Sequence, residues 1–243
     1  MKKEFWYILI AYIGMQLSSF IGVPFIVYWG TLYGKSMADM ETLAVTSWIV
    51  FSFTITLILT LVLLRKEIKA SYSMRNTASV GSSIAWAIGG VFLALIAQSI
   101  AANIETMIGI EVGSENTQQI IRLIEAAPVV VIISSVIGPI LEEIVFRKIL
   151  FGTLHKRLNF FFSALISSVI FALAHFEFAH ILLYSAMGFT FAFLYVKTKR
   201  IIVPMFAHVA MNTFVVIIQF NKDQIENWLK EMEKIQSFIG GFL

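Results

Sequence analysis

The sequence predicts an all-α polytopic membrane protein, a bundle of about seven to eight transmembrane helices with an amphipathic C-terminal helix. Of the 243 residues, 58% are hydrophobic and 14% are charged, whereas soluble domains carry about a quarter charged residues. Several uncharged runs also exceed about 18 residues, the length that a helix needs to cross a bilayer. An ordinary soluble globular domain is therefore excluded.

Charged residues separate the predicted spans. Uncharged runs occupy residues 5–34, 42–64, 76–104, 126–141, 158–174, 178–196 and 201–221. The first run is too long for a signal-peptide core and no small-residue cleavage pattern follows it, so we expect a retained helix. No internal repeat or low-complexity linker divides the chain, and we therefore treat residues 1–243 as a single transmembrane domain.

The basic residues predict a cytoplasmic N-terminus. With that orientation the inner segments hold 13 of the 18 Lys and Arg residues, in agreement with the positive-inside rule. They are Lys2, Lys3, Arg65, Lys66, Lys69, Arg75, Arg147, Lys148, Lys156, Arg157, Lys197, Lys199 and Arg200. Arg147 is counted here although it is placed equally well inside a span. Topology thus explains the net charge of +3, and no nucleic-acid partner is expected.

The opposite side is expected to hold an acidic loop and the C-terminus a surface helix. Between residues 103 and 127 the chain carries Glu105, Glu111, Glu115 and Glu125 against Arg122. In the tail, residues 221–243, apolar residues recur every three or four positions: Ile225, Trp228, Leu229, Met232, Ile235 and Phe238. This spacing predicts an amphipathic helix that lies on the membrane, with docking on a partner as the alternative.

The candidate catalytic core is residues 126–220, where ionisable groups occur inside the predicted spans. Such groups are costly in hydrocarbon and mark functional sites. Glu142 and Glu143 follow an apolar run, and Arg147 is four residues beyond Glu143, a spacing that allows an ion pair. That pair is equally compatible with a structural and a catalytic role. Glu142 points about 100° away on the helix and is the better candidate for a base or metal ligand.

Three more polar residues fall in the later spans. His175 ends the fifth run, and His208 and Asn212 lie four residues apart on one helix face of the seventh. At about 1.5 Å of rise per residue, the site residues lie about 12 to 24 Å from the inner basic residues, so they can converge. Each alone would be explained by an interhelical hydrogen bond. Together, in spans without other charges, they predict one buried site, and His180 is expected at its mouth.

Three motifs in separate predicted spans resemble those of a known family. EExxxR runs from Glu142 to Arg147, FxxxH from Phe171 to His175, and HxxxN from His208 to Asn212. They are similar to the motifs of the CPBP family, the CAAX-protease and bacteriocin-processing intramembrane endopeptidases, also called Abi proteins. The resemblance covers about the last half of the chain, and every motif position is intact. It implies a bacterial-type plasma-membrane protease that cleaves a membrane-associated protein or peptide.

The resemblance also implies catalytic roles for Glu142, Glu143, His175, His208 and Asn212, with Arg147 as support. Glu142 would activate the water and His175 would assist. One scheme has Glu142, His175 and His208 hold Zn²⁺ with an open position for water. The other uses no metal, and His208 and Asn212 donate hydrogen bonds to the oxyanion. Asn212 favours the second scheme slightly, because an amide is an ordinary oxyanion donor but a poor zinc ligand.

Other protease chemistries find little support. The chain has no cysteine and no HExxH motif, and its only aspartates, Asp39 and Asp223, lie outside the predicted spans. Ser185 lacks a nucleophile motif, although a serine nucleophile paired with a histidine from another span is left as an alternative.

Two functions of other classes are alternatives to a protease. One is a non-catalytic scaffold, such as a bacteriocin-immunity or cell-envelope regulatory protein, which would not need every motif position filled. The other is a transporter with a proton relay, against which the absence of repeated halves argues. The Gly138-Pro139 pair predicts a kink that opens a water path to the carboxylates.

Overall fold

The computed structural model describes residues 1–71, 77–111 and 113–240, and these are helical with no strand. Arg75 and the last three residues of the predicted tail lie outside the described residues. The elements are α1 (Lys3–Leu32), α2 (Met37–Ser71), α3 (Val80–Met107), α4 (Glu115–Ala126), α5 (Val130–Ile132), η1 (Ile133–Ile137), α6 (Gly138–Glu142), η2 (Glu143–Phe151), α7 (Gly152–Leu154), α8 (Phe160–Leu173), η3 (Phe178–His180), α9 (Ile181–Thr198), α10 (Ile202–Phe220) and α11 (Lys222–Gly240).

The all-α fold of a membrane protein is confirmed. In the described part of the chain, five helices are long and apolar enough to cross a bilayer: α1, α2, α3, α10 and the stretch from η3 through α9. Two other helical regions coincide with predicted spans. These are residues 130–154, where π-helical segments interrupt the α-helix, and the shorter apolar helix α8. The number of spans, seven or eight, stays a prediction.

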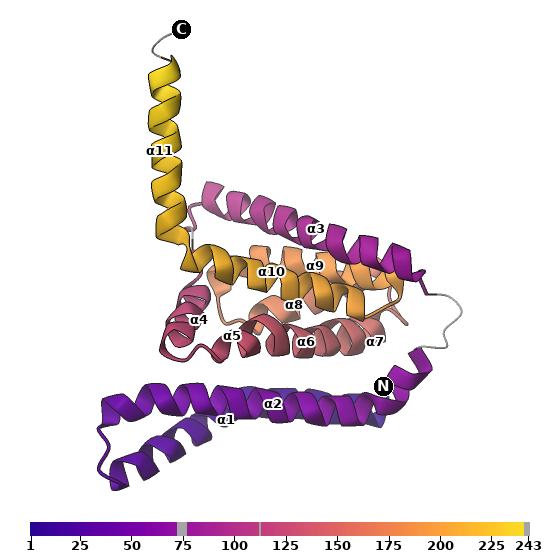
Figure 1. Cartoon of the computed structure of the whole chain (residues 1–243). Coiled ribbons are helices and arrows are strands. Elements are labelled where there is room, and N and C mark those ends of the chain that lie inside the picture. Colours follow the sequence, from indigo (N-terminus) through magenta and orange to yellow (C-terminus); the bar gives the residue numbers. More distant parts are fainter. Residues whose placement is uncertain (72–76, 112, 241–243) are drawn as a thin grey trace.

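The first two helices form an antiparallel hairpin along one side of the molecule (Figure 1). Lys2 at the start of α1 forms an ion pair with Glu67 near the end of α2. Close packing along the hairpin requires a small residue, because a Cβ at Gly22 would overlap the ring of Trp48. The hairpin reaches the rest of the bundle through Tyr12, whose ring packs edge-on against Phe146 at 5.9 Å.

Helices α8, α9 and α10 pack on one side of the 130–154 region and the α1–α2 hairpin on the other, and α3 packs on the outside of α9 and α10 (Figure 1). Helices α3 and α9 run antiparallel, since Ala78 donates to the carbonyl of Thr198 at one end and Glu105 accepts from Leu183 at the other. At Gly188 of α9 a Cβ would lie 2.9 Å from Ser168 of α8, so these two helices approach closely. The 130–154 region therefore lies in the centre of the bundle.

The last helix, α11, extends away from the bundle beyond the end of α10 (Figure 1). The predicted helix is present, and its apolar residues Trp228, Leu229 and Met232 are exposed. An exposed apolar stripe of this kind suits a membrane surface. That location, like the division of the chain into a protease core and a tail, stays a prediction.

Candidate active site

Glu142 and Glu143 lie at the junction of α6 and η2, where the helix changes from α to π geometry. Short π-helical turns are rare and often occur at functional sites. The side chain of Glu143 is completely buried, whereas that of Glu142 is 19% exposed. Of the two carboxylates, Glu142 is the one that water can reach.

Glu143 contacts a cation on one side and a histidine on the other. Its Oε1 accepts a hydrogen bond from Nδ1 of His208 at 3.0 Å, and its Oε2 lies 3.3 Å from Nε of Arg147. The contact with Arg147 has the distance of an ion pair but not the direction of a hydrogen bond. The predicted pairing of Glu143 with Arg147 is confirmed, and the same carboxylate fixes His208.

The guanidinium of Arg147 is enclosed by aromatic rings. Its central carbon lies 4.3 Å from the ring centre of Phe171, 5.4 Å from that of Phe191 and 6.0 Å from that of Phe146. Its N–H groups have no hydrogen-bond acceptor among the described residues, so Glu143 and the ring faces balance its charge. Arg147 is therefore a core residue, and its assignment to an inner loop is wrong.

His208 bridges the two carboxylates through its two ring nitrogens. A carboxylate accepts hydrogen bonds, so Nδ1 is the nitrogen that donates to Glu143, and in the neutral ring Nε2 carries the lone pair. That Nε2 lies 3.7 Å from Oε2 of Glu142. The ring stacks on Phe191 with centres 4.6 Å apart, which fixes its plane. Because 3.7 Å is too long for a direct hydrogen bond, a water molecule can bridge these two atoms.

His175 lies in the turn after α8 and is held by its neighbours. Its Nδ1 donates to the carbonyl of Phe171 at 2.8 Å, so in the neutral ring Nε2 carries the lone pair. The ring stacks on Tyr184, with centres 4.1 Å apart and planes 23° apart. The side chain of Phe171 contacts both histidine rings, with its centre 4.6 Å from His175 and 6.1 Å from His208.

Asn212 is tied to the segment that precedes the carboxylates. Its side-chain amide donates to the carbonyl of Ser134 in η1 at 3.4 Å. In this π-helical segment the backbone N–H of Gly138 donates to the carbonyl five residues before it. With the same spacing, the carbonyl of Ser134 would accept from the backbone N–H of residue 139, which is Pro139. Proline has no N–H, and Asn212 satisfies that carbonyl in its place. The predicted break at Gly138-Pro139 takes the form of a π-helical turn, while the water path stays a prediction.

The structure thus brings Glu143, Arg147 and His208 into direct contact and places Glu142 3.7 Å from His208. His175 reaches this group through Phe171, and Asn212 is one helical turn along α10 from His208. Within the described ranges, no three His, Asp or Glu side chains form a group able to hold a metal ion. The predicted zinc ligands, Glu142, His175 and His208, do not fit a closed three-ligand site, and the metal stays a prediction of the sequence.

A second polar cluster was missed in the sequence. Glu105 is buried in the last turn of α3, where its carboxylate accepts from the backbone N–H of Leu183 at 2.9 Å and contacts Nδ1 of His180 at 2.8 Å. Nε2 of His180 donates to the carbonyl of Gly113 at 2.8 Å. The placement of Glu105 in an outer loop is therefore wrong, and the bundle holds a charge besides the motif residues.

Glu177 forms the neighbouring part of this cluster, between α8 and η3. Its carboxylate accepts hydrogen bonds from the hydroxyl of Tyr184 at 2.6 Å, the hydroxyl of Ser114 at 2.8 Å and the backbone N–H of Asn116 at 2.9 Å. Partial burial raises the pKa of Glu177, but these donors outweigh burial and hold the pKa below its ordinary value. A glutamate two residues after the motif histidine was the available signal.

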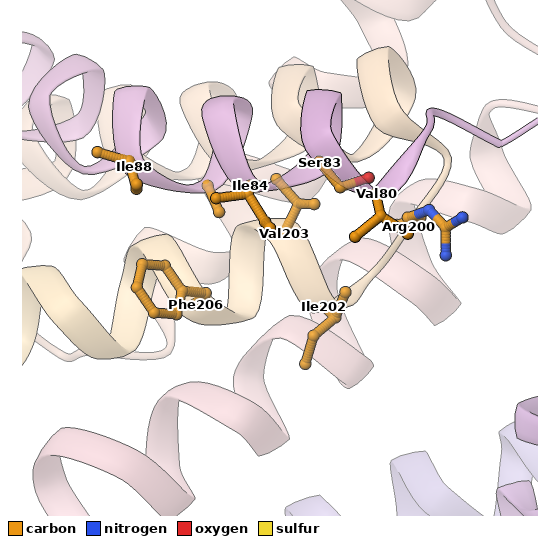
Figure 2. Close-up of a pocket in the computed structure, with 9 residues that line it drawn as sticks. Val80, Ser83, Ile84, Ile88, Arg200, Ile202, Val203 and Phe206 are labelled. Carbon is orange, nitrogen blue, oxygen red and sulfur yellow. The ribbon is translucent and has the colours of Figure 1, made fainter.

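The remaining candidates lie apart from the carboxylates. The hydroxyl of Ser185 is buried without a hydrogen-bond partner among the described residues, so the structure pairs it with no histidine. A cavity of about 340 Å³ between α3 and α10 is almost wholly apolar, with Arg200 at one end (Figure 2). None of the predicted site residues lines this cavity.

Comparisons with known proteins identify the family. The family described as type II CAAX prenyl endopeptidase Rce1-like matches residues 124–214, the stretch that holds all three motifs. The chain is 48% identical over 243 residues, 99% of either chain, to a Bacillus subtilis (strain 168) protein named "Putative membrane peptidase YdiL". Over 143 residues it is 41% identical to "Membrane-embedded CAAX protease MroQ" of Staphylococcus aureus (strain USA300), which covers 56% of this chain and 58% of that one.

No solved structure gives a significant match to this chain. The relative that spans nearly the whole chain, the matched family and the apolar helices agree with one another. The chain belongs to the Rce1-like CAAX prenyl endopeptidase family, and it is an intramembrane peptidase that works in a lipid bilayer on a peptide or protein substrate.

Proposed function

We propose that this peptidase hydrolyses a peptide bond of a membrane-associated protein or peptide with a water molecule activated by Glu142. The observation that carries the proposal is the 3.7 Å separation between Oε2 of Glu142 and Nε2 of His208. A water oxygen about 2.8 Å from both atoms fits this separation. Glu143 is completely buried and already contacts two partners, so it suits the support of His208 better than the reaction itself.

In the proposed reaction, Glu142 alone accepts and returns the transferred proton. Glu142 takes one proton from the water as its oxygen attacks the scissile carbonyl carbon, and a tetrahedral oxyanion forms. The protonated Glu142 then gives its proton to the amide nitrogen while the C–N bond breaks. The products are a carboxylic acid and an amine, and Glu142 is again a carboxylate.

The other motif residues are assigned supporting roles. Nδ1 of His175 is engaged by the Phe171 carbonyl, which leaves Nε2 free to assist proton transfer. The Asn212 amide uses one hydrogen for the Ser134 carbonyl, and its second hydrogen can donate to the oxyanion. No step of this scheme passes through a metal ion. A metal bound by Glu142, His175 and His208 would supply Lewis-acid activation of the water.

Location and orientation complete the proposal. A bacterial plasma membrane with the N-terminus in the cytoplasm suits the distribution of Lys and Arg. Lys2 and Glu67 share one end of the molecule, and the backbone contact of Ala78 with Thr198 brings the neighbouring basic Lys197, Lys199 and Arg200 beside α3. The substrate is a segment that the bilayer brings to the bundle.

The test compares Glu142→Gln with the wild type in proteoliposomes, and mass spectrometry detects cleavage of a panel of membrane-anchored peptides. Removing a general base costs on the order of 10² to 10⁴ in rate, so cleavage should fall by at least that lower factor. Glu115→Gln, on α4, is the matched control and should cleave at the wild-type rate. A Glu142→Gln protein that melts normally and cleaves at full rate would refute the proposal.

A further inference from the structure

Tyr184 of α9 contacts both His175 and Glu177. Its ring lies almost parallel to the His175 imidazole at 4.1 Å, and its hydroxyl donates to Oε2 of Glu177 at 2.6 Å. Tyr184 is itself buried. The chain thus contains a continuous contact path from the motif histidine to a carboxylate outside the spanning helices.

Glu177 in turn joins this path to the start of α4. Its two oxygens accept from the backbone N–H of Asn116 and the hydroxyl of Ser114, the residue that caps α4. An acidic side chain at a helix N-terminus is stabilised by the free N–H groups there. Three donors on two segments, the start of α4 and α9, therefore fix the carboxylate, and through it the position of the Tyr184 hydroxyl.

His175 needs such support because the backbone around it is not regular helix. It follows the end of α8, and the next residue, Phe176, has a positive φ of 57°. A single hydrogen bond from Nδ1 to the Phe171 carbonyl leaves the imidazole free to swing, since the χ2 torsion of histidine is broad. Stacking on a fixed ring removes most of that freedom, while Nε2 stays unengaged.

We infer that Tyr184 is a positioning residue for catalysis, which acts by holding the imidazole plane of His175 through its hydrogen bond to Glu177. The inference rests on the proposed function, in which His175 assists the reaction. Simple core packing would need only the aromatic ring, and phenylalanine would serve equally well. The hydroxyl and its carboxylate partner therefore separate the two roles.

The kinetic test measures kcat and KM for Tyr184→Phe and Tyr184→Leu in proteoliposomes. Because misplaced catalytic groups lose rate and not binding, kcat should fall on the order of tenfold in Tyr184→Phe and further in Tyr184→Leu, with KM unchanged. Tyr195→Phe, a partly buried tyrosine further along α9, is the matched control and should keep the wild-type kcat. Unchanged kcat in Tyr184→Phe, or a loss seen only in thermal stability, would overturn the inference.

Double variants show whether Tyr184 acts through the named partners. Tyr184→Phe combined with Glu177→Leu should lose no more kcat than the stronger single variant, since each single variant removes the same hydrogen bond between the Tyr184 hydroxyl and residue 177. In a His175→Ala background, Tyr184→Leu should change kcat no further. A full additional loss in that background would show that Tyr184 acts elsewhere. Wild-type kcat in His175→Ala alone would instead remove the role of His175 from the proposed function, and this inference with it.

A spectroscopic measurement tests the geometry without any substrate. The chain has four histidines, so selective histidine labelling gives a simple NMR spectrum. The His175 ring signals should carry a ring-current shift that Tyr184→Leu removes and that Glu177→Leu, which has no acceptor for the Tyr184 hydroxyl, alters. If Glu177→Leu leaves those signals unmoved, the inferred positioning is wrong even when Glu142→Gln has abolished cleavage.

Discussion

The guanidinium of Arg147 lies 4.3 Å from the ring centre of Phe171, completely buried between aromatic side chains. Its charge therefore depends on Glu143, which is equally buried. A buried ion pair is costly to break, because removing one partner leaves the other charge without compensation.

Arg147→Leu should accordingly be strongly destabilising. We expect a loss of about 3 to 5 kcal/mol of unfolding free energy, measured by denaturant titration in detergent micelles. The exposed pair Lys222 and Glu226 has the same spacing of four residues and is the control. Lys222→Ala should cost less than about 1 kcal/mol. Equal effects of the two substitutions would contradict the stabilising role of the buried pair.

Glu142 and Glu143 should respond differently to the same substitution. Glu143→Gln removes the charge that balances Arg147 and orients His208, so both the melting temperature and kcat should fall. Glu142→Gln should lower kcat while the melting temperature stays close to that of the wild type, because this side chain is partly exposed and has no short partner. Thermal unfolding and cleavage assays on one preparation measure both quantities. Identical behaviour of the two variants would argue against separate roles.

Chelation should leave cleavage unchanged. Within the described part of the chain, no three His, Asp or Glu side chains form a group able to hold a metal ion, and this favours the reaction without a metal. Metal content and cleavage rate, measured with and without a strong chelator, check this expectation. Parallel loss of metal and activity, with recovery on adding Zn²⁺, would instead support the zinc scheme.

Gly188→Ala should loosen the contact between α8 and α9. The new Cβ would lie 2.9 Å from the side chain of Ser168 and 3.1 Å from its Cα, so the helices themselves would have to move. We expect a loss of about 1 to 3 kcal/mol, as for other overpacked sites. Gly89→Ala on α3 is the control, because its Cβ would meet no atom within 4 Å. That control should be neutral or more stable in a thermal melt.

The stability of the protein should depend on the ionisation of Glu177. Its pKa in the folded state is held below the ordinary value of 4.5, so its contribution is present above about pH 4.5 and is lost as the pH falls through the folded-state pKa. Tyr184, Ser114, Asn116 and His180 are the groups that face it. At pH 7, Glu177→Gln should melt below the wild type, and the difference should shrink in acid. A constant difference from pH 7 to pH 3 would contradict this.

The sequence predicted the fold class and much of the carboxylate site. Uncharged runs located the spanning helices, and the spacing of four residues predicted the pairing of Glu143 with Arg147. Both features depend on local periodicity, which one sequence displays directly. The sequence predicted only that His208 and the carboxylates lie in one site. It did not predict their contacts, because these distances depend on how α10 packs against η2.

Other parts of the site could not be predicted because they depend on contacts between distant segments. Glu105 and Glu177 come at the ends of apolar runs, where charges ordinarily mark loops. Their partners, Leu183 and Asn116, are supplied by helix ends that only the folded bundle brings near. The π-helical turns likewise could not be predicted, because apart from Pro139 no residue pattern in the sequence indicates them.

The proline before the carboxylates has an effect on a helix that it is not bonded to. Because Pro139 has no backbone N–H, the carbonyl of Ser134 accepts a hydrogen bond from the Asn212 side chain of α10 instead. This hydrogen bond fixes the position of α10 along its axis relative to the 130–154 region. His208, one turn from Asn212, therefore lies level with Glu142 and Glu143. The missing backbone N–H of one proline thus helps to align the carboxylates with His208, although they are separated by more than sixty residues in the sequence.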